Sequence, residues 1–350
     1  MSKQLSKDQQ NLFNEVRSMI EEARLKVSQT INAGLTILYW NIGKRINEEV
    51  LRHKRAEYGK EIVVTLSRQL IREYGNNFNE KNLRRMVQFS KLFSDFEIVV
   101  TLSRQLSWSH FIVIIPLKTE LERSFYAEMC RVENWSVRTL RSKIQSMLFE
   151  RTAISQKPEE LAKKELETLR EKDQLSPDLV FQNPYVLDFL GLKDTFLEKD
   201  LEQAILNKLE HFLLELGSGF AFAERQKRMV IDGNDYKLDL LFYHRKLRRL
   251  VAIDLKIGKF KAEYKGQMEL YLRWLEKNEM EEGEEQPIGL ILCAEGNHEQ
   301  IELLQLDKTN IKVGQYITRF LLEDFTNSFN FFFNKSLGRN LVMYCPTLIL

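Results

Sequence analysis

Cysteine is scarce in this chain, long apolar runs are missing, and neither charge dominates. The three cysteines, Cys130, Cys293 and Cys345, are odd in number and widely spaced, which excludes a disulfide framework and a cysteine-based zinc site. We therefore expect reduced thiols. No stretch approaches the roughly 18 apolar residues that cross a membrane, and the polar first ten residues lack the apolar core of a secretion signal. We expect a cytoplasmic protein that does not contact a membrane.

Two common catalytic motifs are also absent. Gly43-Lys44-Arg45 lacks the G-x-x-x-x-G-K-[ST] frame of a phosphate-binding P-loop, and no H-E-x-x-H motif of a zinc protease occurs. The five histidines are scattered. His244 lies in a basic turn, where we expect it to face DNA or solvent rather than act as a general base.

The composition is that of a folded protein with a locally uneven charge. With 350 residues, 43% of them hydrophobic and 29% charged, the chain suffices for two domains with separate cores. The net charge of +2 predicts no polyanionic partner by itself. However, residues 225–265 hold 12 Lys or Arg against 5 Asp or Glu, which indicates either a nucleic-acid track or a solvated basic face.

The first 150 residues show the periodicity of helices. Asn79 is placed to cap a helix through NEKNLRRMVQF, whose exposed positions would include Asn82, Arg84 and Arg85. These side chains suit contacts with phosphates or base edges if the helix enters a groove. The alternative is a surface helix with ordinary charges.

One decapeptide, EIVVTLSRQL, occurs twice, at residues 61–70 and 97–106. Its apolar positions fall at helical intervals, so we expect two equivalent helices in related surroundings. They would form a compact helix-turn-helix-like module, in which Arg68 and Arg104 face a partner or the solvent.

The composition changes again after the helical region. Lys, Glu and Leu dominate residues 155–174, which suits a surface helix. We expect a helical domain that binds DNA or a partner over residues 1–154, a charged connector helix over 155–176, and an α+β domain over 177–318. Residues 319–350 are rich in Phe, and an exposed aromatic tail of this kind would reduce solubility.

The α+β domain begins with a helix from Glu198 to Leu216, which Gly217 ends. An Asp-Gly-Asn turn at residues 232–234 then joins two strands, and a basic reversal leads into a third strand, LVAIDLK. A further helix and the apolar strand IGLILCA follow. The order helix, three strands, helix, strand predicts an αβββαβ core.

Strand geometry places three charged side chains together. Residues two apart on a strand share a face, so Asp254 and Lys256 point the same way, and we expect this face to be open to solvent or a ligand. Asp239 lies on the face opposite to the apolar residues of the preceding strand, so antiparallel pairing would bring it beside Asp254. The residues expected to face the core are Val251, Ile253 and Leu255 in one strand and Tyr236, Leu238, Leu240 and Phe242 in the other.

Two neighbouring carboxylates repel each other unless a cation lies between them, and their oxygens suit Mg²⁺ or Mn²⁺. A bound cation lowers the pKa of water and stabilises charge on a phosphate, while an ammonium group holds the attacking oxygen or the phosphoryl oxygen. Asp239, Asp254 and Lys256 together therefore suit phosphodiester hydrolysis. The alternative is that Asp254 and Lys256 alternate on an exposed edge strand to keep the protein soluble.

These residues resemble the motif of the PD-(D/E)xK nuclease superfamily, and nearly the whole chain resembles its bacterial YhcG-type nucleases. Asp239 matches the first acid and Asp254-Leu255-Lys256 the second half of the motif, although Leu238 replaces the proline of some members. The segments WSHF at 108–111, SFYAEMC at 124–130 and NWSVRTLR at 134–141 resemble the helical, winged-helix-like domain that accompanies the nuclease.

The resemblance implies a restriction-endonuclease-like core and a metal-dependent nuclease acting on DNA, in recombination, repair or defence, with RNA also open. Asp239, Asp254 and Lys256 would be catalytic, and Glu202 would join the two acids around Mg²⁺ or Mn²⁺. Gln267 and Tyr271 resemble a Q-x-x-x-Y helix motif beside the metal, which adds Gln267 to the catalytic set. The side chains expected to contact nucleic acid are Arg225, Arg245, Arg248, Lys259, Lys261, Tyr271, Arg84 and Arg85.

Two other functions remain open. The chain could bind nucleic acid or serve as an adaptor on a nuclease scaffold that no longer cuts, but such a site would normally have lost Lys256 or one carboxylate. A purely structural helical protein would leave the pattern around Asp254 unexplained. A homo-oligomer is compatible with every alternative.

Overall fold

The computed structural model describes residues 7–52, 56–192, 196–296, 298–306 and 309–318. The chain divides into two compact units. A helical unit comprises Met1–Glu150 with Ile154–Gln174, and a sheet unit comprises Arg151–Ala153 with Leu175–Leu350. The Phe-rich tail expected at residues 319–350, which includes Cys345, lies outside the described residues. The other two cysteines, Cys130 and Cys293, are buried free thiols.

The described regular elements of the helical unit are all helices, so the wing of a winged helix has no counterpart among its described residues. The unit contains α1 (Lys7–Arg52), α2 (Ala56–Tyr74), η1 (Asn76–Phe78), α3 (Glu80–Leu92), α4 (Phe96–Ser103), α5 (Trp108–Ile114), α6 (Glu120–Glu133), α7 (Val137–Gln145), α8 (Leu148–Arg151, its last residue in the sheet unit), η2 (Ala153–Gln156, from its second residue) and α9 (Glu159–Lys172). None of the described helices is both long and apolar enough to span a bilayer.

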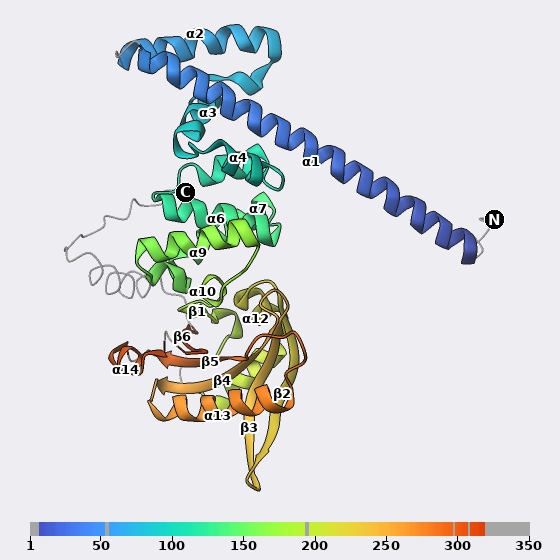
Figure 1. Cartoon of the computed structure of the whole chain (residues 1–350), viewed down its shortest axis with the longest axis vertical. Helices are drawn as coiled ribbons and strands as arrows, with labels where there is room; N and C mark the ends of the chain where they lie inside the picture. The colour runs from blue at the N-terminus through green and yellow to red at the C-terminus, as the bar shows by residue number, and fades with distance from the viewer. Residues whose placement is uncertain (1–6, 53–55, 193–195, 297, 307–308, 319–350) are drawn as a thin grey trace. The chain divides into compact units, whose positions relative to one another are not determined.

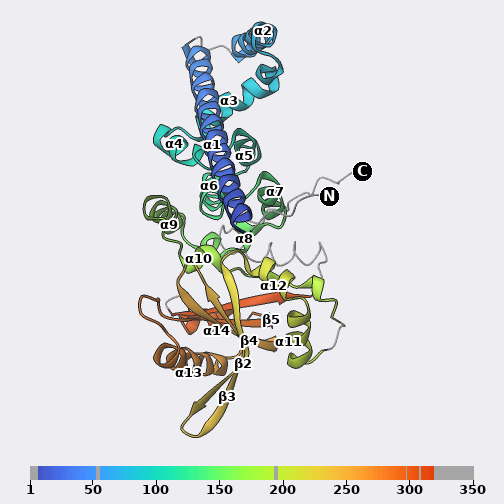
Figure 2. The same cartoon turned by 90° about the vertical axis from the view of Figure 1, so that its right-hand side faces the viewer.

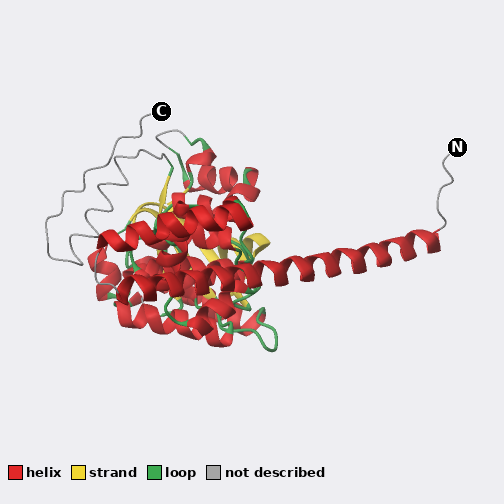
Figure 3. Cartoon of the chain, turned by 90° about the horizontal axis from the view of Figure 1, so that it is seen from above, coloured by secondary structure: helices red, strands yellow, loops and turns green. Residues whose placement is uncertain are grey.

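Helix α1 is in contact with α3 through its C-terminal half. Gly43 permits this contact, because a Cβ there would lie 1.9 Å from the Met86 carbonyl oxygen. Nearby, the Trp40 indole donates a hydrogen bond of 2.7 Å to the Phe93 carbonyl. The N-terminal half of α1 extends away from the other helices of its unit (Figures 1 and 3).

The N-cap expected at Asn79 is confirmed, since its side chain accepts a hydrogen bond from the Asn82 amide. The prediction that Asn82 is exposed and available to contact phosphates or base edges is wrong. Its side chain donates to the Asn77 carbonyl and accepts from the Trp108 indole, so both ends are engaged within the unit. Arg84 is exposed and pairs with Glu80 one turn earlier on α3, while Arg85 is half-buried.

The two copies of the repeated decapeptide adopt similar but unequal conformations. The first copy lies wholly inside α2, whereas the helix of the second copy, α4, ends at Ser103, three residues before the copy does. Val63 and Val99, at the same place in the two copies, are both buried. Arg68 and Arg104 are both exposed, as expected.

Helix α9, expected as a connector, is in contact with α6 inside the helical unit. Glu128 on α6 is completely buried and accepts hydrogen bonds from Arg131 and Arg170. A buried carboxylate is stable only when it is paired in this way, so this ion-pair cluster ties α9 to α6.

The sheet unit confirms the α+β class and the predicted order of helix, three strands, helix and strand. Its elements are α10 (Pro177–Val180), β1 (Tyr185–Val186), η3 (Asp188–Leu190), α11 (Glu198–Asn207), α12 (Leu209–Leu216), β2 (Phe220–Ile231), β3 (Asn234–His244), β4 (Arg249–Lys259), α13 (Glu263–Asn278), β5 (Ile288–Glu295), α14 (His298–Leu303) and β6 (Ile311–Ile317). The sheet order is β1-β6-β5-β4-β3-β2, with β2, β3 and β4 antiparallel and the remaining pairs parallel.

Helices cover both faces of this sheet. Leu201 of α11 and Phe212 of α12 pack with Ile253 on one face, and Met268 of α13 packs with Ala252 on the other; Figure 2 shows α11 and α13 on opposite sides. The expectation that the Asp254 face is open to solvent is therefore wrong: Asp254 is only 2% exposed. The parallel strands β4 and β5 are buried on both faces over residues 251–255 and 288–293, as central parallel strands usually are.

The turn expected at residues 232–234 is present. Asp232 and Gly233 both have positive φ angles, 50° and 79°, which is the geometry that joins two strands with the right twist. The helix expected from Glu198 to Leu216 is broken at Lys208 into α11 and α12. His244, expected in contact with solvent or DNA, is completely buried, and its Nδ1 accepts a hydrogen bond from the Leu247 amide.

Candidate active site

The site forms where β3 and β4 separate. Their pairing extends from His244↔Arg249 to Leu240↔Ile253 and then stops. The next amide of β4 that points toward β3, that of Leu255, donates instead to the carboxylate Oδ2 of Asp239 at 2.8 Å. Asp239 thus replaces a main-chain acceptor at the point of separation.

The separation of β3 from β4 also shows that the apolar residues of β3 do not all share one face, although the sequence predicted that they do. Leu240 and Phe242 pack with α11 and α12, but Tyr236 and Leu238 belong to the cluster of α13 on the other face. Beyond Leu240 the strand pairs with β2 alone, so the β2–β3 hairpin no longer follows the faces of the sheet.

Asp254 and Lys256 share a face of β4, as the sequence predicts. Lys256 Nζ lies 2.8 Å from Asp254 Oδ2, and both side chains are largely buried. The same ammonium group lies 5.4 Å from the centre of the Tyr264 ring, a cation–π contact. Continuing the β3–β4 register by one pair places Asp239 opposite Asp254, so the structure brings the three motif residues together.

Glu202 extends the site from α11. Gln226 Nε2 donates to Glu202 Oε2 at 2.8 Å and to Asp239 Oδ1 at 3.2 Å. The other carboxylate oxygen, Glu202 Oε1, is buried, accepts no hydrogen bond from any described residue, and lies 3.8 Å from the Nε of Arg225. One amide group therefore separates two acids that would otherwise repel each other.

Sequence reasoning missed Gln226 and Glu198. Gln226 has a φ of 47°, a left-handed conformation that no residue pattern announces within a strand and that is often associated with functional sites. Glu198 Oε1 accepts a hydrogen bond of 3.2 Å from the Ile257 amide of β4. Its position, four residues before Glu202 on α11, was a usable signal because residues at i and i+4 share a helix face.

Gln267 and Tyr271 lie together on α13, as their spacing predicts. Gln267 Nε2 donates to the Tyr271 hydroxyl at 2.6 Å, and this hydroxyl donates to the Lys237 carbonyl at 3.2 Å. Tyr271 is only 1% exposed, so the expectation that it contacts nucleic acid is wrong. The tyrosine instead fixes α13 to β3 and holds Gln267 in place.

The acids of the site favour their protonated forms more than ordinary carboxyls do. Burial raises the pKa of Asp254 to about 6, against the lowering effect of Lys256, and the charges of Asp239 and Glu198 add to the rise. Burial also raises the pKa of Asp239, and burial followed by the charge of Asp239 raises that of Glu202. Such shifts are characteristic of acids held together for function.

Lys256 remains a cation. Burial lowers the pKa of its ammonium group, but the charge of Asp254 and its hydrogen bond, and then the charges of Glu198 and Asp239, raise the pKa above its ordinary value. The side chain therefore acts as a fixed positive charge at neutral pH rather than as a base.

The donors fit a hard divalent cation in chemical type, because they are carboxylate oxygens. Glu202 Oε1 is a buried oxygen without a donor among the described residues, and the three acids all have raised pKa values. Within the described residues, no three His, Cys, Asp or Glu side chains have the geometry of a ligand set. Lys256 engages Asp254, and Gln226 lies between Glu202 and Asp239, so ion binding requires these contacts to rearrange.

The basic residues expected to contact nucleic acid fall into separate groups. Arg225 lies on β2 beside Glu202, and Lys259 and Lys261 follow Lys256 along the chain; all three are exposed. Arg245 and Arg248 are also exposed, but they lie in the turn before β4. Lys261 lies 5.9 Å from the centre of the Tyr264 ring that Lys256 also contacts, whereas Arg248 donates to the Gly283 carbonyl. Arg84 and Arg85 belong to the other unit.

A mixed sheet with two acids and a lysine at one strand separation, helices on both faces and a Q-x-x-x-Y helix alongside is the arrangement of the PD-(D/E)xK nucleases. Two family models match the chain: the DUF1016 N-terminal domain over residues 15–151 and the YhcG PDDEXK nuclease domain over residues 178–329.

A relative from Escherichia coli (strain K12), "Putative nuclease YhcG", is 34% identical over 316 residues, which cover 82% of this chain and 84% of the relative. The chain therefore belongs to the YhcG family of PDDEXK nucleases. Among solved structures, the "crystal structure of a repair endonuclease from Pyrococcus abyssi" matches 35% of this chain and 49% of that chain, with 20% identity and a TM-score of 0.26.

Proposed function

We propose that this protein hydrolyses phosphodiester bonds of DNA with the help of Mg²⁺ or Mn²⁺. The observation that carries the proposal is the grouping of Asp239, Asp254 and Lys256 where β3 and β4 separate, with Glu202 on the adjoining helix. Membership of a nuclease family supports cleavage as the reaction.

In this proposal the acids hold the cation and the lysine acts on the substrate. Asp239, Asp254 and Glu202 would hold the ion through carboxylate oxygens, and a bound ion would supply a lowered pKa of water and neutralisation of phosphate charge. Lys256, once released from Asp254, would donate to the attacking oxygen or to a phosphoryl oxygen. Gln267, held by Tyr271, would orient groups beside the site.

Arg225, Lys259 and Lys261 form the proposed track for the DNA backbone. All three are exposed cations close in sequence or in space to the acids, and phosphate contacts account for most of the affinity of such interfaces. Arg245 and Arg248, and Arg84 and Arg85 of the helical unit, are proposed as further contacts outside this track. RNA is the alternative substrate. DNA recombination, repair or defence in the cytoplasm is proposed as the process that this cleavage serves.

The second candidate function is a nucleic-acid-binding or adaptor protein that no longer cuts. In favour of it, Lys256 and Gln226 engage the carboxylates, and no ligand set of three is formed among the described residues. The cutting enzyme is preferred because all three motif side chains are present together with Glu202 and Gln267.

Cleavage assays with a pair of matched variants test the proposal. Purified protein is incubated with labelled linear, circular and branched DNA and with RNA, in Mg²⁺, in Mn²⁺ and in EDTA. Asp254→Asn removes one charge from the site, and Asp235→Asn removes one from an exposed ion pair with Arg228 in the β2–β3 hairpin.

We expect cation-dependent cleavage of DNA by the wild type and by Asp235→Asn, and a loss of at least about 100-fold in Asp254→Asn. Intact folding of both variants is checked by circular dichroism. Equal cutting by Asp254→Asn and the wild type, or undiminished cutting in EDTA, would contradict the proposal. Binding of DNA without cleavage under all these conditions would favour the adaptor.

A further inference from the structure

The N-terminal half of α1 exposes an apolar stripe. Every described side chain from Asn14 to Asn32 is exposed, whereas the buried residues of α1 begin at Thr36. Seven large apolar side chains of α1 form the stripe, with exposed fractions from 41% to 69%: Val16, Met19, Ile20, Val27, Ile31, Leu35 and Leu38. A continuous apolar surface of this kind marks an interaction site.

The stripe repeats every 11 residues. Val16, Val27 and Leu38 are separated by this interval, and so are Ile20 and Ile31. An 11-residue repeat equals about 3.67 residues per turn, close to the 3.6 of a straight α-helix. The apolar side chains therefore stay on one face over 22 residues, or about 33 Å, as in one helix of a long helix pair.

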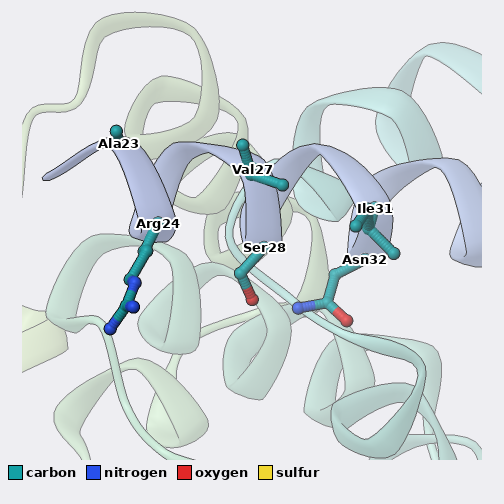
Figure 4. A pocket seen from close by; sticks show the side chains of 6 residues that line it. All are labelled: Ala23, Arg24, Val27, Ser28, Ile31 and Asn32. Carbon is teal, nitrogen blue, oxygen red and sulfur yellow. The ribbon is translucent and has the colours of Figure 1, made fainter. Parts of the chain in front are cut away.

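The middle of the stripe borders a shallow hollow of about 450 Å³ on the surface of α1. Figure 4 labels the side chains that line it: Ala23, Arg24, Val27, Ser28, Ile31 and Asn32. Small residues next to branched ones give this surface the holes and projections with which two helices interlock.

The charges beside the stripe argue against a nucleic acid or an anionic membrane as its occupant. Either occupant requires an excess of basic residues. The segment 14–32 instead carries three acidic and three basic residues, which balance: Glu15, Glu21, Glu22, Arg17, Arg24 and Lys26.

The apolar positions fit a second copy in either direction. In an antiparallel pair centred between Ala23 and Arg24, Ile20 lies level with Val27 of the second copy, and Val16 lies level with Ile31. In a parallel pair each apolar residue lies level with its own counterpart. The charges do not choose a direction, because Glu21 and Lys26 lie about 140° apart around the helix, on opposite edges of the stripe.

The area is that of a small but specific interface. At the exposures given above, the seven side chains present roughly 600 Å² on each helix, so a pair would bury on the order of 1,200 Å², the lower limit for stable interfaces. Pairing would remove from water the apolar face that this part of α1 exposes.

We propose that the apolar stripe of α1 binds the stripe of a second copy of this chain, as a helix pair. The protein is then a homodimer held through its helical unit. This inference does not depend on the reaction proposed for the sheet unit.

The molar mass of the full chain in solution, measured by light scattering after gel filtration, tests the dimer. Ile20→Glu with Val27→Glu places charges in the stripe. The matched control, Ser18→Glu with Gln29→Glu, places the same charges on the opposite face of the same helix segment. We expect the mass of two chains for the wild type and the control, and of one chain for the stripe variant.

A second measurement does not rely on loss of association. Ile20→Cys and Val27→Cys variants, one with a longer tag, are mixed and oxidised, and we expect disulfide-linked dimers, with the mixed disulfide predominating in an antiparallel pair and the self-disulfides in a parallel pair. Ser18→Cys and Gln29→Cys on the opposite face are the control, and equal linking through both faces would overturn the helix pair. A wild-type mass of one chain at about 50 μM, well above the Kd of a specific dimer, would overturn the second copy as occupant and assign the stripe to a different protein.

Discussion

At the scale of single residues, the site consists of acids kept apart by neutral and basic neighbours. Gln226 is the clearest case, because its one amide nitrogen donates to both Glu202 and Asp239. In the proposed cation complex these acids no longer need a donor between them. Gln226 is therefore a positioning residue for the cation-free form.

Gln226→Ala tests this role. Without the amide, the buried Glu202 and the half-buried Asp239 each lose a donor, and we expect the free energy of unfolding in EDTA to fall by about 1–3 kcal/mol. In saturating Mn²⁺ the deficit should disappear, because the ion then joins the acids. Thermal unfolding with and without Mn²⁺ measures both values. Gln203→Ala, which removes an exposed bond to Asn207 on α11, is the control, and an equal deficit in both conditions would assign Gln226 to the fold alone.

The pH dependence of cleavage is set first by Asp254. Its pKa is raised to about 6, and only the ionised carboxylate holds a cation. At limiting Mn²⁺, the rate of cleavage should therefore reach its maximum above about pH 7 and fall by about tenfold for each pH unit below 6. Because the ion competes with the proton, more Mn²⁺ should move the midpoint to lower pH. Rates measured from pH 5 to 8 that stay constant would contradict the assignment.

The raised pKa of Asp254 has the opposite effect on the stability of the cation-free protein, which it favours at low pH. The folded protein binds the Asp254 proton more tightly than the unfolded chain, whose value is near the ordinary 3.8. The stabilising contribution of this group is therefore largest below about pH 4 and is lost as the pH rises through 6.

At the scale of elements, local patterns predicted most of the fold. The period-2 alternation in β4 predicted the shared face of Asp254 and Lys256, and the Asp-Gly-Asn turn predicted the hairpin. Patterns within one segment could not predict that α13 would cover the Asp254 face, because this depends on the packing of distant elements. For the same reason, the sequence could not predict where β3 separates from β4 or that Gln226 lies between the acids.

Helix α1 offers a prediction about packing between elements. Gly43→Ala would place a methyl group 1.9 Å from the Met86 carbonyl oxygen, so α1 and α3 must move apart. We expect a loss of about 1–3 kcal/mol in the stability of the helical unit. Gly34→Ala on the same helix meets nothing within 4 Å and should stabilise by about 0.5–1 kcal/mol through higher helix propensity. Chemical unfolding followed by circular dichroism distinguishes the two, and similar effects of both variants would contradict the close contact.

At the scale of the whole molecule, the net charge of +2 is nearly neutral, but residues 225–265 of the sheet unit carry a basic excess. Affinity for DNA should therefore depend on a few cations of the sheet unit rather than on the overall charge. The salt dependence of binding counts these cations, because each phosphate contact contributes about 0.9 to the slope of log K against log salt.

Two double variants compare the groups of cations. Lys259→Gln with Lys261→Gln, which follow Lys256 along the chain, should reduce the magnitude of the slope by roughly 1–2. Arg245→Gln with Arg248→Gln, in the turn before β4, should change it by less. Fluorescence anisotropy with a short DNA duplex between 50 and 300 mM salt, roughly the range over which counterion release is measured, gives both slopes. A larger change from the arginine pair would move the proposed track to that turn.

The amide of Leu255, which binds the carboxylate of Asp239, links chemistry to architecture. One side chain closes the ladder at the strand separation and also belongs to the proposed ion site. A relative of this chain without the proposed cleavage activity would be free to exchange Lys256, but loss of Asp239 would leave the Leu255 amide without its acceptor. Selection for a stable fold should therefore preserve Asp239 even where selection for cleavage has ended. The presence of Lys256 is then the better indicator of catalytic activity.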